Sequence, residues 1–109
     1  MVFYNIFDFL KMSSSENKII YLKDFSRNPT GIDHNDSEFN AEAFRDIILR
    51  NYDSNPLTIN LDGVLGISSA FLYHAIGKLP EFGVDTNLIT IDVFDQSIIM
   101  EIHNYWKEQ

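Results

Sequence analysis

The chain of 109 residues has the length of a single domain, and its hydrophobic share of 45% and charged share of 22% are those of an ordinary globular protein. It contains no cysteine, which excludes a disulfide framework, thiolate metal ligands and a cysteine nucleophile. Its net charge is −8 and its basic residues are scattered. Binding to nucleic acids or to anionic lipid surfaces is therefore not expected, because both would be repelled.

The first segment, residues 2–10, is apolar but is interrupted by Asn5 and Asp8. No apolar run in the chain reaches the roughly 20 residues needed to cross a bilayer. The segment also lacks the basic region and the small-residue cleavage site of a signal peptide. We therefore expect a cytoplasmic protein without a membrane anchor. The segment is compatible with a strand or a short amphipathic helix, and we favour the strand.

A polar turn over residues 13–17 leads to residues 18–25 (KIIYLKDF), whose β-branched and aromatic content predicts a second strand. The two strands would pair as a hairpin. Residues 26–37 are dense in turn formers and include Pro29 and Gly31, so we expect a loop. Its length exceeds that of a typical connection, and long loops in compact domains are often functional.

The next element is a helix from Asn40 to about Arg50. Asn40 is a suitable N-cap, and Glu42 lies in the first turn, where the helix dipole favours an anion. An apolar stripe follows helical spacing and consists of Phe39, Ala43, Phe44, Ile47 and Ile48. The turn-forming residues 51–56 (NYDSNP) end the helix.

Residues 57–61 (LTINL) alternate and predict a strand, and residues 62–67 (DGVLGI) predict a glycine-containing turn. Ser68 or Ser69 then caps a second helix that extends to about Leu79. Its buried face would consist of Phe71, Leu72, Ala75, Ile76 and Leu79. Gly77, Pro80 and Gly83 close it.

Residues 87–94 (NLITIDVF) form the clearest strand pattern, and Asp95 caps a final helix that extends to Lys107. Strands that alternate with helices predict parallel pairing through right-handed crossovers. We therefore expect one α/β domain over residues 1–109, with a mixed, mostly parallel sheet of about four strands and three helices.

Two blocks of this sequence carry a resemblance to a known family. They are SRNPTGIDHND…NAEAFR and LDGVLGISSAFLYHAIGKL, and they are similar to the patterns of the small bacterial STAS-like domain proteins, a family of unknown function. The matching residues of the first block are Ser26, Arg27, Pro29, Gly31, Asp36, Glu42, Phe44 and Arg45. Those of the second are Leu61, Asp62, Gly63, Gly66, Ser69, Phe71, Leu72, Ala75, Gly77 and Leu79. The blocks cover about half of the chain, and the resemblance implies a STAS-like fold.

The chain departs from the family pattern at several positions. Ile32 stands where the family usually has Arg, and Asn40-Ala41 stand where it usually has Ser-Gly. Ala70 replaces a second serine, and Tyr73 and His74 stand where an acidic residue is expected. If that arginine and that acid serve the family's activity, we expect the activity to be lost or altered in this chain.

The wider STAS group includes anti-sigma-factor antagonists, which carry a regulatory serine at the start of a helix that follows a strand. A partner kinase phosphorylates this serine. By this fold-level analogy, the corresponding place is held by Ser68 and Ser69. A phosphate there would meet the unpaired N–H groups of a helix start. The alternative is that these serines only cap the helix.

Two further groups of residues are candidates for binding. Asp62, Gly63 and Gly66 follow a strand, and the carboxyl ends of parallel strands often host ligands. Alternatively, Asp62 and Gly63 only form the turn. The second group, Arg27, Asp36, Glu42 and Arg45, would form an ion-pair network that pins the long loop to the helix, or would grip a carboxylate or phosphate of a partner.

We expect no metal, cofactor or enzymatic activity. His34, His74 and His103 lack ligand spacing, and the acidic run DHNDSE lacks the register and glycine of a calcium loop. No nucleophile motif, P-loop or dinucleotide fingerprint is present.

Three functions are compatible with these sequence features. The first is a regulatory module that binds another protein, with an ATPase- or kinase-type partner implied by the resemblance and with Ser69 as the switch. The second is a small-ligand or nucleotide-binding domain that uses Gly63, Gly66 and the helix start. The third is a structural or self-assembling dimer, joined through the apolar N-terminal segment and through Tyr105 and Trp106.

Overall fold

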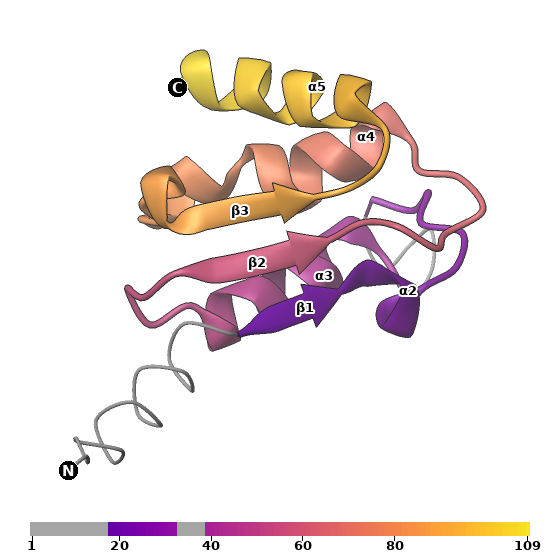
Figure 1. Cartoon of the computed structure of the whole chain (residues 1–109), viewed down its shortest axis with the longest axis horizontal. Helices are drawn as coiled ribbons and strands as arrows, with labels where there is room; N and C mark the ends of the chain where they lie inside the picture. Colours follow the sequence, from indigo (N-terminus) through magenta and orange to yellow (C-terminus); the bar gives the residue numbers. More distant parts are fainter. Residues whose placement is uncertain (1–17, 33–38) are drawn as a thin grey trace, which may run out of the picture.

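A computed structural model describes residues 18–32 and 39–109 of the protein. Three short strands, β1 (Ile19–Tyr21), β2 (Leu57–Asn60) and β3 (Ile89–Asp92), form one sheet in the order β1-β2-β3 (Figure 1). Both pairings are parallel, and the register places Ile20 beside Ile59 and Ile59 beside Ile91. Neighbouring strands are therefore consecutive in the chain and are joined by helical crossovers.

The first crossover contains α2 (Leu22–Phe25) and α3 (Ala41–Asn51). The second contains α4 (Ser69–Leu72), a π-helical turn η1 (Tyr73–Gly77) and two 3-10 turns, η2 (Leu79–Phe82) and η3 (Thr86–Leu88). The final helix is α5 (Gln96–Lys107). Figure 1 shows α3 and α4 behind the sheet and α5 on the side of β3.

Alternation along the strands separates the two faces of the sheet. Leu57, Ile59, Ile89 and Ile91 are buried and belong to the core, together with buried residues of α3, α4, η1 and α5. The alternate positions of β2 and β3, which are Thr58, Asn60, Thr90 and Asp92, are half-buried or exposed. Successive residues of a strand point to opposite faces, so this pattern places the helices on one face.

Three of the predicted elements are confirmed. The helix expected from Asn40 to Arg50 is α3, and the Asn40 side chain accepts a hydrogen bond from the Ala43 N–H at 2.8 Å. The final helix begins at the Asp95 cap, as expected. The strand expected over residues 57–61 is β2.

The strand expected over residues 18–25 is half wrong, because only Ile19–Tyr21 are strand and Leu22–Phe25 form α2. In a strand, Asp24 would share the face of Leu22. In a helical turn, Leu22 is fully buried and Phe25 packs against the core, while Lys23 and Asp24 are exposed. The helical turn therefore avoids the burial of a charged side chain.

The helix expected from Ser68 to Leu79 is confirmed at its Ser68 cap and in its buried face, but it is not one regular α-helix. After four α-helical residues, the Lys78 N–H bonds to the Tyr73 carbonyl at 3.0 Å, which is a π-helical pairing. Pro80 has no N–H to continue the helix, and η2 follows as a 3-10 turn. The last predicted strand is likewise shorter than expected, since η3 occupies its start.

The expected count of four strands and three helices is therefore not met. The described residues contain three strands, all parallel, and four α-helices. The predicted strand at residues 2–10, and with it the hairpin, lies outside the described residues. In the part of the chain that the structure describes, no helix is long and apolar enough to cross a membrane.

Candidate functional site

A cleft of about 460 Å³ opens at the carboxyl ends of β2 and β3, which is the edge where parallel sheets commonly bind their ligands. We call it the carboxyl-edge cleft. The loop after β2 contributes Asp62, Gly63 and Gly66, and the β3–α5 junction contributes Phe94 and Asp95. Glu101 of α5 also lines it. Three of the residues predicted from sequence thus lie together.

Polar side chains join the two loops that form this cleft. Asp62 accepts a hydrogen bond from the Phe94 N–H at 2.9 Å. The Asn60 side chain donates to Asp92 at 3.1 Å and accepts from the Asp62 N–H at 3.0 Å. Asp62 therefore has a structural role, because it holds the loop after β3 against the loop after β2.

The two glycines of the cleft differ in whether a larger residue could replace them. Gly63 has a φ of +88°, and a Cβ there would lie 2.9 Å from the Cδ atom of Lys23. Gly66 has no atom of the described residues within 4 Å of such a Cβ. The positive φ thus favours glycine at position 63, while the flexible Lys23 side chain could move aside, and the space around Gly66 is open.

Backbone hydrogen bonds pin the predicted long loop to its neighbours. The Arg27 carbonyl accepts from the Leu65 N–H at 2.6 Å, and the Pro29 carbonyl accepts from the Ser68 N–H at 3.3 Å. On its other side, the Gly31 carbonyl accepts from the first residue of α3 at 2.9 Å. These contacts give a physical reason why the two family-like blocks occur together: each block is hydrogen-bonded to the other.

The ion-pair network expected to pin that loop is absent from the described residues. Arg27 and Glu42 are exposed, and the ion pair found in the described part of the chain joins Lys18 to Asp53 instead. Arg45 donates to the His74 carbonyl at 2.7 Å and lies 4.4 Å from the Phe82 ring centre. Asp36 lies outside the described residues.

The neighbouring serines have different environments. Ser68 is the N-cap of α4, because its hydroxyl accepts from the Phe71 N–H at 3.0 Å. Ser69 is the first residue of the helix and is exposed. Ser68 is thus occupied by capping, whereas the Ser69 hydroxyl is accessible to solvent.

Ser69 is linked to the cleft through Tyr105. The Tyr105 hydroxyl donates to Glu101 at 2.5 Å, and this bond, burial and the charge of Glu101 raise the pKa of Tyr105 to about 12. The nearby Ser69 side chain acts in the opposite direction and lowers that pKa. Ser69 therefore lies close to Tyr105, whose hydroxyl is bonded to Glu101 of the cleft wall.

Carboxylates are the charged groups of the cleft wall. The lining includes Asp62, Asp95 and Glu101, and it has no lysine, arginine or histidine among the described residues. A hydrogen bond from Ser97 lowers the pKa of Asp95, which keeps that cap ionised. No group of three or more metal-ligating side chains occurs in residues 18–32 and 39–109. The cleft is thus electrostatically unfavourable to a phosphate-bearing ligand.

Two large apolar side chains beside the cleft were missed by the sequence reasoning. Leu65, in the loop after β2, is 87% exposed, and Phe94 is 91% exposed. The exposure of Phe94 could have been predicted from the alternation of side chains along the strand. Phe94 lies on the same side as the exposed Thr90 and Asp92, opposite the buried Ile91. Glu101 was also missed, and Tyr105 was named only for a dimer contact, since only the fold brings α5 close to Ser69.

Comparison with known proteins gives one match. A family model described as a STAS-like domain of unknown function matches residues 40–95, from the cap of α3 to the cap of α5. No curated protein and no solved structure matches the chain. The matched segment spans more than half of the sequence and includes the loop after β2, Ser69 and the β3–α5 junction. The chain belongs to the family of STAS-like domains of unknown function.

Proposed function

We propose that this domain is a non-enzymatic regulatory module that binds another protein at the carboxyl-edge cleft. The observation that carries the proposal is the near-complete exposure of Leu65 and Phe94 on the two loops that form the cleft. Exposed large apolar side chains on the loops around a concave surface are typical of protein-binding sites. The partner-switching proteins of the wider STAS group make an ATPase- or kinase-type partner the first candidate.

Ser69 is the proposed control point. Ser69 is exposed, and it lies close to Tyr105, whose hydroxyl bonds Glu101 in the cleft wall. A phosphate on Ser69 would replace a neutral hydroxyl by a charge of about −2 next to this acidic wall. The added charge would repel Glu101 and disrupt the Ser69–Tyr105 contact, and the partner surface would change in shape and charge.

The other two functions have less support. A nucleotide ligand would bring phosphates to a cleft whose charged groups are Asp62, Asp95 and Glu101. A dimer through Tyr105 and Trp106 would compete with contacts inside the domain, because Tyr105 bonds Glu101 and the Trp106 Nε1–H donates to the Ile76 carbonyl at 2.9 Å.

The test is a quantitative pull-down from a lysate of the source organism with wild-type, Leu65→Asp, Phe94→Asp and Met100→Asp baits. Met100 is the matched control, because it is an exposed apolar residue of α5, 65% exposed, outside the cleft lining. We expect one specific partner that is lost with Leu65→Asp and Phe94→Asp and kept with Met100→Asp. A partner that is kept by all four baits, or lost by all three variants, contradicts the proposal.

The control at Ser69 is tested separately with the partner so identified. Ser69→Glu is expected to weaken binding, whereas Ser69→Ala leaves it unchanged, and mass spectrometry of the native bait should find phosphate on Ser69. If Ser69→Glu and the wild type bind the partner equally, control by phosphorylation of Ser69 is contradicted. The proposed binding site at the cleft would be unaffected by that result.

A further inference from the structure

A second hollow of the domain lies at the end of the sheet where the strands begin, away from the carboxyl-edge cleft. Its volume is about 470 Å³, a size typical of small-molecule sites. It lies between the start of β3 and the last turns of α5, two segments that Figure 1 shows at the same end of the molecule. We call it the amino-edge pocket. Its lining consists of Thr86, Asn87, Ile89, His103, Trp106 and Lys107.

One wall of the amino-edge pocket is aromatic and is held in a fixed orientation. His103 and Trp106 lie one turn apart on α5, with their ring centres 5.4 Å apart and an angle of 31° between the ring planes. The Trp106 Nε1–H donates to the Ile76 carbonyl at 2.9 Å, which positions the indole before any ligand binds. Ile89 adds an aliphatic side chain to the same lining. Because aromatic side chains pack well against other flat rings, this wall suits a planar aromatic group.

The charge of this pocket differs from that of the protein as a whole. The chain carries a net charge of −8, and the carboxyl-edge cleft is lined by carboxylates. The lining of the amino-edge pocket contains no carboxylate among the described residues, and it includes the ammonium group of Lys107. The Thr86 hydroxyl and the Asn87 side-chain amide add neutral hydrogen-bond donors. An ammonium group beside neutral donors suits a carboxylate.

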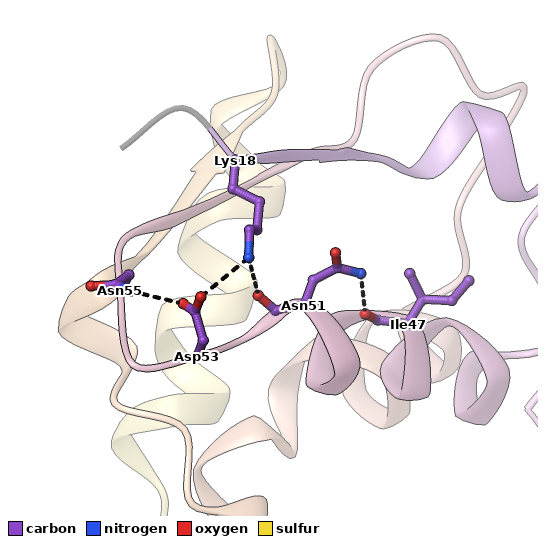
Figure 2. Close-up of polar contacts among 5 residues, drawn as sticks. All are labelled: Lys18, Ile47, Asn51, Asp53 and Asn55. Carbon is purple, nitrogen blue, oxygen red and sulfur yellow. Dashed lines mark hydrogen bonds and ion pairs between the residues drawn. The ribbon is translucent and has the colours of Figure 1, made fainter. Parts of the chain in front are cut away.

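The polar side chains of the pocket are available to a ligand. Figure 2 shows the contrast with the lysine that precedes β1: the Lys18 Nζ atom donates to the Asn51 carbonyl at 3.0 Å and pairs with Asp53 at 3.4 Å. Lys107 is exposed, and it forms no ion pair or hydrogen bond with the described part of the chain through its side chain. The side chain of Asn87 is likewise exposed and without a hydrogen-bond partner in residues 18–32 and 39–109. A bound carboxylate would therefore displace no contact of these two groups.

We propose that the amino-edge pocket binds a small aromatic carboxylate, with its ring against Trp106 and its carboxylate at Lys107 and Asn87. Lys107 lies in the last turn of α5, where the terminal carbonyl groups carry partial negative charge. One ammonium group in this position balances a carboxylate monoanion better than the phosphate of a nucleotide, whose charge approaches −2. The site is separate from the carboxyl-edge cleft, so this proposal and the proposed protein-binding function are tested independently.

The test is a titration of the full chain with benzoate, followed by NMR through the amide and indole N–H signals. Trp106 is the single tryptophan of the chain, so one indole signal reports directly on the pocket. We expect the Trp106 indole and Asn87 amide signals to shift and to saturate. Benzamide lacks the charge, cyclohexanecarboxylate lacks the flat ring, and adenosine monophosphate carries a phosphate. Each should bind about threefold or more weakly than benzoate.

Two variants test the role of the ammonium group. Lys107→Gln is expected to weaken the binding of benzoate about threefold and to leave that of benzamide unchanged. Lys23→Gln is the matched control, because it also removes an exposed lysine but lies outside the pocket lining, and it should change neither. The remaining amide signals of both variants show whether the fold is intact.

Several outcomes would overturn the proposal. The first is the absence of a saturable shift of the Trp106 indole signal with benzoate. The second is a benzoate affinity no higher than that of benzamide, cyclohexanecarboxylate or adenosine monophosphate. The third is an equal loss of affinity in Lys107→Gln and Lys23→Gln, because benzoate would then respond only to the net charge of the protein.

Discussion

The two crossovers of the sheet use helices that are stabilised in different ways. α3 is one regular α-helix of 11 residues, with the Asn40 cap at its start and Phe44 and Ile48 fully buried on one stripe. The helix of the second crossover remains α-helical for only four residues before it becomes η1 and then η2. The first helix is specified by its own sequence, whereas the second depends on its neighbours.

That dependence is visible at the carbonyl groups that the irregular helix leaves free. In a regular helix the His74 carbonyl would accept from Lys78, but the Lys78 N–H bonds to Tyr73 instead. The His74 carbonyl accepts from Arg45 of α3 at 2.7 Å. A side chain of the first crossover thus completes the backbone hydrogen bonds of the second.

The next carbonyls are satisfied from α5 and the residues after it. Ile76 would pair with residue 80, but that residue is Pro80, and the carbonyl accepts from Trp106 at 2.9 Å. The Gly77 carbonyl loses its partner to the 3-10 turn of η2 and accepts from Gln109. Since a buried carbonyl without a partner is costly, these side chains are what permits the break.

The sharpest way to break this arrangement is Arg45→Ala. The variant loses a charge-assisted hydrogen bond to His74 and the contact of the guanidinium with the Phe82 ring. We expect the free energy of unfolding to fall by about 2–3 kcal/mol. The buried Arg45 Nε atom has no hydrogen-bond partner among the described residues, so its removal offsets part of the loss. Urea denaturation monitored by circular dichroism gives the value.

Arg50→Ala is the matched control for Arg45→Ala. Arg50 lies on the same helix and carries the same side chain, but it is exposed in the last turn. Its replacement should change stability by less than about 0.5 kcal/mol. Equal losses for the two variants would show that η1 does not depend on the hydrogen bond from α3.

The next expected effect is at Gly77, where η1 packs against α5. A Cβ atom there would lie 2.9 to 3.1 Å from three carbon atoms of the Tyr105 side chain. Gly77→Ala should therefore destabilise by about 1–2 kcal/mol, since Tyr105 must move. In the interior of a helix without such a contact, replacement of glycine by alanine stabilises by roughly 0.5–1 kcal/mol. A loss of stability in Gly77→Ala would therefore indicate the contact with Tyr105. Thermal unfolding of the variant measures it.

Gly66→Ala is the reference for that measurement. Gly66 has no positive φ, and no atom of the described residues lies within 4 Å of the position that a Cβ would take there. Its replacement should leave the melting temperature nearly unchanged or raise it slightly. A loss at Gly66 as large as that at Gly77 would indicate a general intolerance of the chain to alanine rather than close packing at α5.

The same contrast explains how much the sequence predicts. α3, α5, β2 and β3 were predicted because caps and apolar periodicity are local signals. The breaks at η1 and at α2 were not, since they depend on partners about 30 residues away or on the burial of Leu22. At the site, Asp62 and Gly63 were found because strand ends are predictable, whereas Glu101 and Tyr105 reach Ser69 only through tertiary packing.

The smallest expected effect concerns Tyr105, which packs against Gly77 of η1 and bonds Glu101 of the cleft wall. The hydrogen bond to Glu101, burial and the Glu101 charge raise its pKa from 10 to about 12. Because the folded pKa of the phenol is raised, the neutral form is favoured by folding. The associated stability is fully present below about pH 10 and is lost as the pH rises towards about 12.

Alkaline titration of tyrosine absorbance measures this difference. The difference between the titration curves of the wild type and Tyr105→Phe should show one tyrosine that ionises near pH 12. Glu101→Gln should move this ionisation towards pH 10, because it removes the nearby negative charge. Ser69→Ala should raise the pKa of Tyr105 further, since the nearby Ser69 side chain lowers it in the wild type. If Tyr105 ionised at pH 10 in the wild type, its hydroxyl would not be bonded to Glu101 in solution. That result would contradict the proposed connection between Ser69 and the cleft wall.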